Sequence, residues 1–241
     1  MHYIAEMDYR ARLKALRDDT DPVDDHEDAY ARFLRNASPV GAEVLPEAER
    51  IPVVKLQLLS VADISTLLAA AVRMEAEYDC GKSMYAHLGP KSWHAAAHEV
   101  LYFHRDGWLA RHEAALQARL VSAMIEHAAW CPGDGKMSLA VRCIEMHRYT
   151  VGGSLPNPGH RDQGSVVTMS VLLSDPGQCE GGTFVVWDGQ GRPIEQRLGQ
   201  GEAVVFHSER VHNVSPVLEG ERLSLVVELW TGAENSVDRQ E

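Results

Sequence analysis

The sequence predicts an α+β protein, an antiparallel barrel or jelly roll buttressed by helices. Apolar residues recur with helical spacing in the first 130 residues, and short β-type runs separated by turn residues follow after residue 138. Helices first and strands afterwards are typical of an α+β layout. The chain has 241 residues, of which 45% are hydrophobic, enough for one globular domain with an appendage.

The first part of the chain is polar and acidic. Helical spacing in Ile4–Arg17 and again in His26–Leu34 is interrupted by the acidic segment Asp18–Asp25. We therefore expect an acidic helical N-terminal arm over residues 1–50, followed by a main domain over residues 51–241. Packing of this arm on the main domain is favoured over a partner-binding tail.

The helices of the main domain have clear boundaries. Pro52–Leu59 has the character of a strand, and Ser60-x-x-Asp63 is a capping box in front of a helix that runs to about Glu77. A second long helix is predicted from Gly107 to Trp130, where apolar residues share one stripe. The predicted strands after it are Leu139–Tyr149, Val166–Leu173, Thr183–Trp187, Glu202–Phe206 and Leu223–Trp230.

Composition excludes several classes of protein. With 35 acidic and 23 basic side chains the net charge is −12, which disfavours a nucleic-acid partner held by phosphate contacts. No basic leader and no apolar run of roughly 18 residues is present, so we expect a cytoplasmic protein without a membrane partner. The four cysteines lie far apart, which suits a reducing compartment and excludes a cysteine-based zinc ribbon. The oligomeric state stays open.

A candidate metal site begins at His160-x-Asp162. In an extended segment residues i and i+2 project to the same side, so this imidazole and this carboxylate could bind one ion together. A second imidazole from a neighbouring strand would complete the set of two histidines and one carboxylate that is typical of non-haem Fe(II) oxygenases. Alone, the motif is equally compatible with two solvated loop residues.

Arg222 begins a strongly apolar run and is the second candidate. An unpaired guanidinium among Leu223 and Leu225 is costly, so Arg222 requires a carboxylate partner. A cosubstrate could supply that carboxylate through a bidentate contact, with the Ser224 hydroxyl adding a hydrogen bond. An internal aspartate or glutamate is the alternative partner.

Several further motifs occur in a fixed order around these residues. They are Arg148-Tyr149-x-x-Gly152, His160-x-Asp162, the run from Thr168 to Leu172-Leu173-Ser174, Glu180-Gly181-Gly182-Thr183-Phe184, His212-x-Val214-x-Pro216-Val217 and Gly220-x-Arg222-x-Ser224. With them, residues 139–230 resemble the catalytic core of the Fe(II)/2-oxoglutarate-dependent oxygenases, in the prolyl-4-hydroxylase-like branch. The resemblance implies a double-stranded β-helix (jelly-roll, cupin-like) core, buttressed by helices from the N-terminal half.

The resemblance also implies a metal triad. Carried over by position, it makes His160, Asp162 and His212 the catalytic ligands of Fe(II). The V-H-x-V-x-P-V context favours His212 over His207 as the second histidine. A zincin-like helix carrying His94 and His98 is disfavoured, because no glutamate directly follows the first histidine.

Four residues are expected at the cosubstrate. The resemblance implies that Arg222 binds the distal carboxylate of 2-oxoglutarate, assisted by Ser224. Tyr149 would donate a hydrogen bond to the cosubstrate or line its pocket, with a plain core tyrosine as the alternative. Thr168 matches a position whose hydroxyl points toward the same pocket, with a β-branched strand residue as the alternative. Leu172 stands where many relatives carry a tyrosine.

The implied activity is that of a 2-oxoglutarate-dependent dioxygenase. It would use Fe(II), 2-oxoglutarate and O2, with ascorbate as a reductant, and would hydroxylate a peptidyl substrate, prolyl among the candidates, or a small amino-acid-like molecule, releasing succinate and CO2. The carboxylate of Asp162 favours hydroxylation over halogenation. A catalytically silent barrel that binds a ligand or partner protein is the alternative from another class, and a cupin-like enzyme without 2-oxoglutarate is disfavoured by Arg222.

Overall fold

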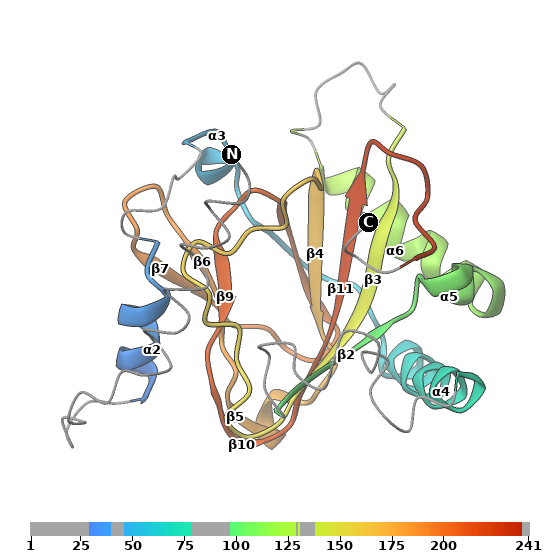
Figure 1. Cartoon of the computed structure of the whole chain (residues 1–241), viewed down its shortest axis with the longest axis horizontal. Coiled ribbons are helices and arrows are strands. Elements are labelled where there is room, and N and C mark those ends of the chain that lie inside the picture. The colour runs from blue at the N-terminus through green and yellow to red at the C-terminus, as the bar shows by residue number, and fades with distance from the viewer. Residues whose placement is uncertain (1–28, 40–45, 79–96, 129, 131–137, 238–241) are drawn as a thin grey trace.

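The computed structural model describes residues 29–39, 46–78, 97–128, 130 and 138–237, and two facing antiparallel sheets form its centre (Figure 1). The larger sheet has six strands in the order β1-β8-β4-β11-β3-β2, and the smaller has the order β7-β6-β9. Strands β10 and β5 form a further pair. The predicted jelly-roll core is confirmed. The strands are β1 (Val54–Gln57), β2 (His98–Tyr102), β3 (Ala140–Tyr149), β4 (Val167–Leu172), β5 (Cys179–Gly181), β6 (Phe184–Trp187), β7 (Pro193–Gln196), β8 (Glu202–His207), β9 (His212–Val214), β10 (Val217–Gly220) and β11 (Arg222–Trp230).

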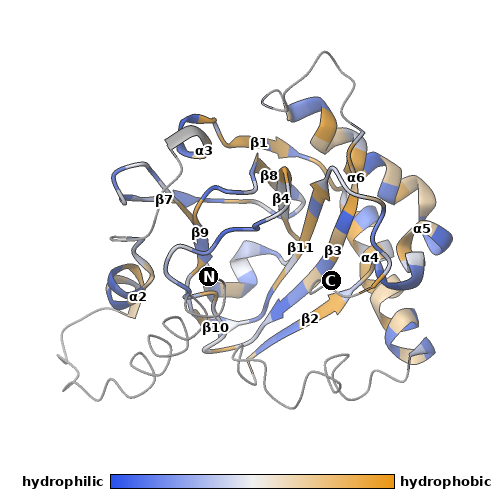
Figure 2. Ribbon diagram, turned by 45° about the horizontal axis from the view of Figure 1, so that its top comes forward, coloured by the Kyte–Doolittle hydropathy of each residue, from blue (hydrophilic) through white to orange (hydrophobic). Residues whose placement is uncertain are grey.

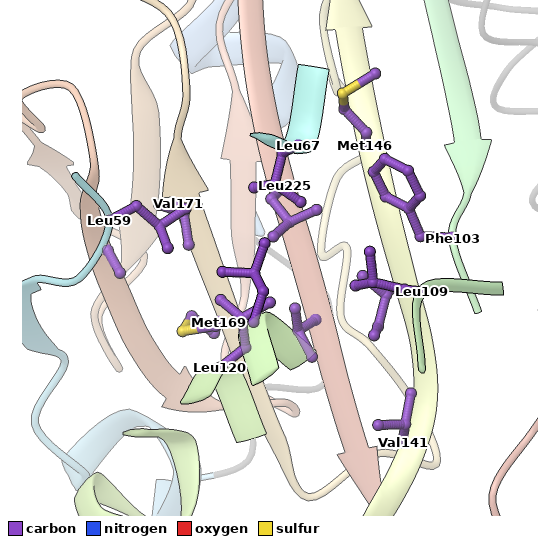
Figure 3. Close-up of a cluster of buried hydrophobic side chains, with 14 of the residues drawn as sticks. Leu59, Leu67, Phe103, Leu109, Leu120, Val141, Met146, Met169, Val171 and Leu225 are labelled. Atoms are coloured by element: carbon purple, nitrogen blue, oxygen red, sulfur yellow. The ribbon is translucent and has the colours of Figure 1, made fainter. Parts of the chain in front are cut away.

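Three helices cover the outer face of the six-stranded sheet (Figures 1 and 2). They are α4 (Val61–Glu77), α5 (Trp108–His112) and α6 (Ala114–His127). Apolar side chains of the helices and of the sheet interdigitate in one cluster between the two layers (Figure 3). Its members include Leu67, Leu109, Leu120, Met169 and Leu225, each fully excluded from solvent. This cluster is the main hydrophobic core, and it holds the sheet from outside.

The inner face of the same sheet is polar. On β11, Leu225 and Val227 point to the helices, so the alternate residues Ser224 and Glu228 point toward the smaller sheet. A second apolar cluster fills part of the space between the sheets, joining Tyr149, Val204 and Phe206 of the large sheet to Phe184, Val186 and Val214 of the small one. The barrel interior is therefore only partly apolar and leaves buried polar side chains beside that cluster.

The described helix α2 (Ala29–Ala37) of the N-terminal segment packs on the outside of the small sheet. Helix α2 buries Phe33 and Ala37 against Val185, Trp187 and Val211. The short helix α3 (Pro46–Arg50) follows it. The predicted helix over residues 4–17 lies outside the described residues, and the domain boundary at residue 50 stays a prediction.

One sequence prediction is wrong. The single helix expected over residues 107–130 is divided into α5 and α6, because Glu113 leaves the helical conformation with φ −135° and ψ 49°. His98 lies in strand β2, paired with Tyr149 of β3. No helix in the described part of the chain is both long and apolar enough to cross a membrane.

The predicted capping box at the start of α4 is present and also links two helices. The Ser60 hydroxyl accepts a hydrogen bond from the Asp63 backbone N–H, and the Asp63 carboxylate accepts one from the Ser60 N–H at 2.8 Å. The same carboxylate lies 2.6 Å from the Arg119 guanidinium of α6. Hydrogen bonds from Ser60, followed by the contact with Arg119, lower the pKa of Asp63 from 3.8 to about 2.

We predict that Asp63→Asn removes an acid-dependent part of the stability. Because the folded pKa lies below the unfolded one, Asp63 stabilises the fold above about pH 4, and its contribution is lost as the pH falls toward 2. The exposed ion pair between Asp63 and Arg119 is also lost in this variant, which should cost about 0.2–1 kcal/mol near neutral pH. Urea unfolding between pH 2 and 7 measures both effects, with Glu126→Gln, an exposed change on α6, as control. Parallel pH profiles for Asp63→Asn and wild type would contradict the prediction.

Candidate metal centre

Two segments far apart in sequence bring three ligand groups together. His160 and Asp162 lie in the connection from β3 to β4, and His212 is the first residue of β9. Their potential ligand atoms all lie within 4.8 Å of one another. Among the described residues, these three side chains form a group that could hold a metal ion. Nε2 of His160 and Nε2 of His212 each lie 3.5 Å from an Asp162 carboxylate oxygen. These three groups are placed to contact one ion.

Main-chain hydrogen bonds join the two segments. The Asp162 N–H donates to the Ser208 carbonyl at 3.0 Å, and the His212 N–H donates to the His160 carbonyl at 3.1 Å. The ligands are therefore held by backbone contacts before any ion binds. This explains why residues 50 positions apart in sequence share one site.

The surroundings of His212 decide which of its nitrogens faces the site. Its Nδ1 lies 3.0 Å from the Arg210 carbonyl, and because a carbonyl can only accept, Nδ1 must carry the proton. In the neutral ring the lone pair is then on Nε2, which faces Asp162 and could bind a metal. Phe184 and Phe206 pack against the ring and fix its plane.

His207 does not take part. It ends β8, and its Nδ1 accepts a hydrogen bond from the Glu209 N–H at 3.1 Å. Its ring lies 6.3 Å from that of Trp130. The structure thus groups His212, and not His207, with His160 and Asp162, while the role of these residues as metal ligands stays a prediction.

Thr168 contacts the metal carboxylate. Its hydroxyl donates to Asp162 Oδ2 at 2.8 Å and lies 2.9 Å from the Ser208 hydroxyl. Both Thr168 and Asp162 are at most 2% exposed. This geometry favours a role in orienting Asp162, while the predicted cosubstrate contact of Thr168 stays a prediction.

Arg222 lies inside the barrel with 3% of its surface exposed. It donates to the Ser224 hydroxyl at 2.7 Å, and its guanidinium lies 5.4 Å from the centre of the Tyr149 ring. No carboxylate of the described residues forms an ion pair with it, so the alternative of an internal acid finds no support there. Burial lowers the pKa of Arg222, while Tyr149 and Cys179 act in the opposite direction. A guanidinium nevertheless stays protonated in proteins, so Arg222 is a buried cation that has no carboxylate partner among the described residues.

The Gly181-Gly182 step makes room for this arginine. Gly182 has φ +61°, and a Cβ there would lie 2.7 Å from Arg222 Cδ. At Gly181 a Cβ would lie 2.2 Å from the Pro216 carbonyl oxygen. Glycines at both positions therefore let β5 and β10 approach closely, and let Arg222 reach the barrel interior.

Sequence reasoning missed a polar chain on the inner side of β3. His147 Nε2 lies 3.0 Å from Glu145 Oε2, and His147 Nδ1 lies 2.9 Å from His98 Nε2. The His98 ring stacks on Tyr149 at 4.0 Å between ring centres. The available signal for this chain was the period of two in β3, which places Glu145, His147 and Tyr149 on one side of the strand. Strand β2 with His98 had no comparable signal in the sequence.

Residues 144–230 match the model of the "2OG-Fe(II) oxygenase superfamily". Over these residues the chain is similar to that superfamily. A PKHD-type hydroxylase of Maricaulis maris is 38% identical over 60 residues, 25% of this chain and 27% of the relative. The matches to curated relatives span only 27% to 57% of the relatives' lengths.

Solved structures show that the fold of this chain is similar to that of prolyl hydroxylases. A Pseudomonas putida prolyl-4-hydroxylase has 17% identity and a TM-score of 0.53, covering 75% of this chain and 94% of its own. A prolyl hydroxylase of Trichoplax adhaerens, in complex with a hypoxia inducible factor oxygen degradation domain peptide fragment, has 13% identity and a TM-score of 0.55, covering 86% and 94%.

We predict that His212→Ala abolishes tight metal binding and that His207→Ala preserves it. Of these two histidines, His212 has its Nε2 beside Asp162, while His207 accepts a hydrogen bond from the Glu209 backbone. Calorimetric titration with Co(II), an oxygen-stable probe, measures the difference. The opposite ranking of the two variants would mean that the ligand assignment is incorrect.

We also predict that Thr168→Val weakens metal binding by about 10-fold or more, because groups that orient a ligand typically contribute 10- to 100-fold to affinity. Valine keeps the shape but removes the hydrogen bond to Asp162. Thr168→Ser, which retains the hydroxyl, is the matched control. Unchanged metal affinity with weakened 2-oxoglutarate binding would instead support a direct cosubstrate contact.

Proposed function

We propose that this chain is an Fe(II)- and 2-oxoglutarate-dependent dioxygenase that hydroxylates a peptidyl substrate, prolyl among the candidates, or a small amino-acid-like molecule. The observation that carries the proposal is the combination of two features inside one barrel: the cluster of His160, Asp162 and His212, and the buried cation Arg222 without a carboxylate partner in the described residues. The curated relatives named PKHD-type hydroxylases support hydroxylation as the outcome.

The donor set fits Fe(II). Two imidazoles and one carboxylate on one side of an ion leave the other positions open, the arrangement of non-haem Fe(II) oxygenases. Asp162 is held by the Thr168 hydroxyl, and His212 presents its unprotonated Nε2. When bound, Fe(II) with 2-oxoglutarate would supply the activation of O2, and the overall balance is substrate C–H, 2-oxoglutarate and O2 going to substrate C–OH, succinate and CO2.

The protein's part is to bind and orient. Arg222 would bind the distal carboxylate of 2-oxoglutarate, replacing the missing anion with a charge-assisted, bidentate contact. Ser224 accepts a hydrogen bond from Arg222 and so fixes the guanidinium plane. Tyr149 lies under the same guanidinium, which supports its place in the wall of the cosubstrate pocket. The helices outside and the apolar cluster between the sheets exclude water from this end of the barrel.

We predict that Arg222→Ala weakens 2-oxoglutarate binding by about 1.5–3 kcal/mol, the value of hydrogen bonds to a charged group, and leaves the metal affinity unchanged. An anaerobic titration of the Fe(II)-loaded protein with 2-oxoglutarate measures this. Arg197→Ala, at a side chain 90% exposed, is the control. An unchanged cosubstrate affinity would refute the assignment of Arg222.

The same preparation tests the activity. After titration, O2 and ascorbate are admitted together with amino acids or proline-containing peptides, and succinate is measured. Substrate-dependent succinate release that is absent from His160→Ala would support the proposal. Failure to bind both Fe(II) and 2-oxoglutarate would instead favour a catalytically silent barrel.

A further inference from the structure

Arg210 links helix α3 to the segment that carries a metal ligand. It lies in the connection from β8 to β9, two residues before His212, and its side chain is 6% exposed. Its NH1 donates to the Glu49 carbonyl at 3.2 Å and to the Ile51 carbonyl at 2.9 Å. The last carbonyls of a helix have no partner within the helix, so Arg210 satisfies groups at the C-terminal end of α3.

The main chain of the same residue orients the ligand. The Arg210 carbonyl accepts the hydrogen bond from His212 Nδ1 at 3.0 Å. Rotation of this peptide would remove the acceptor that fixes both the tautomer and the plane of the imidazole. The contact of the Arg210 side chain with α3 is therefore coupled to the orientation of the His212 ring, because residues 210–212 are consecutive in the chain.

Glu49 adds an electrostatic link to both metal-bearing segments. Its side chain is 3% exposed and lies 4.0 Å from Arg210 NH2. Burial raises the pKa of Glu49, while Arg210, the Val211 backbone and Arg161 act in the opposite direction. Arg161 stands between His160 and Asp162 in the chain. The buried carboxylate thus lies within the field of one arginine from each metal-bearing segment.

The outer side of this region is also covered by the N-terminal helices. Val211, directly before His212, is fully buried in the cluster formed with Phe33 and Ala37 of α2. Removing the guanidinium of Arg210 would also leave the two part-buried carbonyls of Glu49 and Ile51 without this donor.

We propose that Arg210 is a positioning residue for His212, and that helix α3 acts on the metal site through the Arg210 side chain and Glu49. This inference rests on the proposed function, in which His212 is a ligand of Fe(II). It implies that residues 46–51 determine metal affinity although they contain no ligand.

The test compares Arg210→Gln with Arg210→Lys in the full chain. Co(II) binding is measured by calorimetry, and the visible absorption of the Co(II) protein reports on coordination geometry. We expect Arg210→Gln to lower Co(II) affinity by about 10-fold or more, as for other groups that orient a ligand, and to alter the spectrum. Arg210→Lys, which keeps a cationic donor toward the two carbonyls, should recover most of the affinity. Arg197→Gln, the same chemical change at an exposed arginine, should stay within about twofold of wild type.

Two outcomes would overturn the inference. One is a Co(II) affinity and spectrum of Arg210→Gln equal to those of wild type. The other is a lower melting temperature without any change in metal binding, which would assign Arg210 a structural role only. If Arg210→Gln does not fold, Glu49→Gln takes its place, with an expected loss of about threefold or more from the same kind of ligand-orienting contact. Wild-type protein that binds no Co(II), or binds it as well after His160→Ala, would refute the proposed function itself.

Discussion

The structure depends on the two-sided character of its large sheet. Leu225 and Val227 of β11 pack against the helices, while Arg222, Ser224 and Glu228 alternate with them and point inward. A register slip of one residue would turn the charged set toward the helices and the apolar set into the barrel. The hydrophobic core outside the sheet thus fixes the register that places polar groups inside. Because of this constraint, the fold can stay stable although it buries polar and charged side chains, whose burial is costly.

The buried charges inside the barrel differ in how they are compensated. Glu228 is fully buried, accepts a hydrogen bond from Ser165 at 2.6 Å and lies 3.5 Å from Arg142. Arg142 also donates to the Gln163 carbonyl and so holds the connection that follows Asp162. Glu145 has His147 as its partner at 3.0 Å. Arg222 has only a hydroxyl and an aromatic ring among the described residues. The uncompensated cation is the feature that points to an anionic ligand rather than to a structural network.

The sequence was informative wherever chemistry and local spacing coincide. The capping box at Ser60, the spacing of His160 and Asp162, and the placement of Arg222 at the start of an apolar strand each follow from local rules, and the structure agrees with them. Non-local contacts could not be predicted in the same way. The break at Glu113 interrupts an otherwise continuous apolar stripe, and the hydrogen bond of Thr168 to Asp162 depends on how two segments meet. Strand β2 follows a segment without any recognisable period, so the place of His98 in the polar chain had no sequence signal.

The three ligands are unequally fixed before a metal binds. His212 is held at its backbone N–H, at Nδ1 and by two aromatic rings, and Asp162 is held at its N–H and at one carboxylate oxygen. The His160 ring, by contrast, contacts only the other two ligands among the described residues, and its side chain is 18% exposed against 3% and 6% for theirs. Asp162 and His212 therefore form a preorganised pair, and under the proposed function a bound ion would fix the His160 ring as well. The solvent-facing side of the site lies at His160, so an ion approaching from there meets first the ligand that is free to adjust.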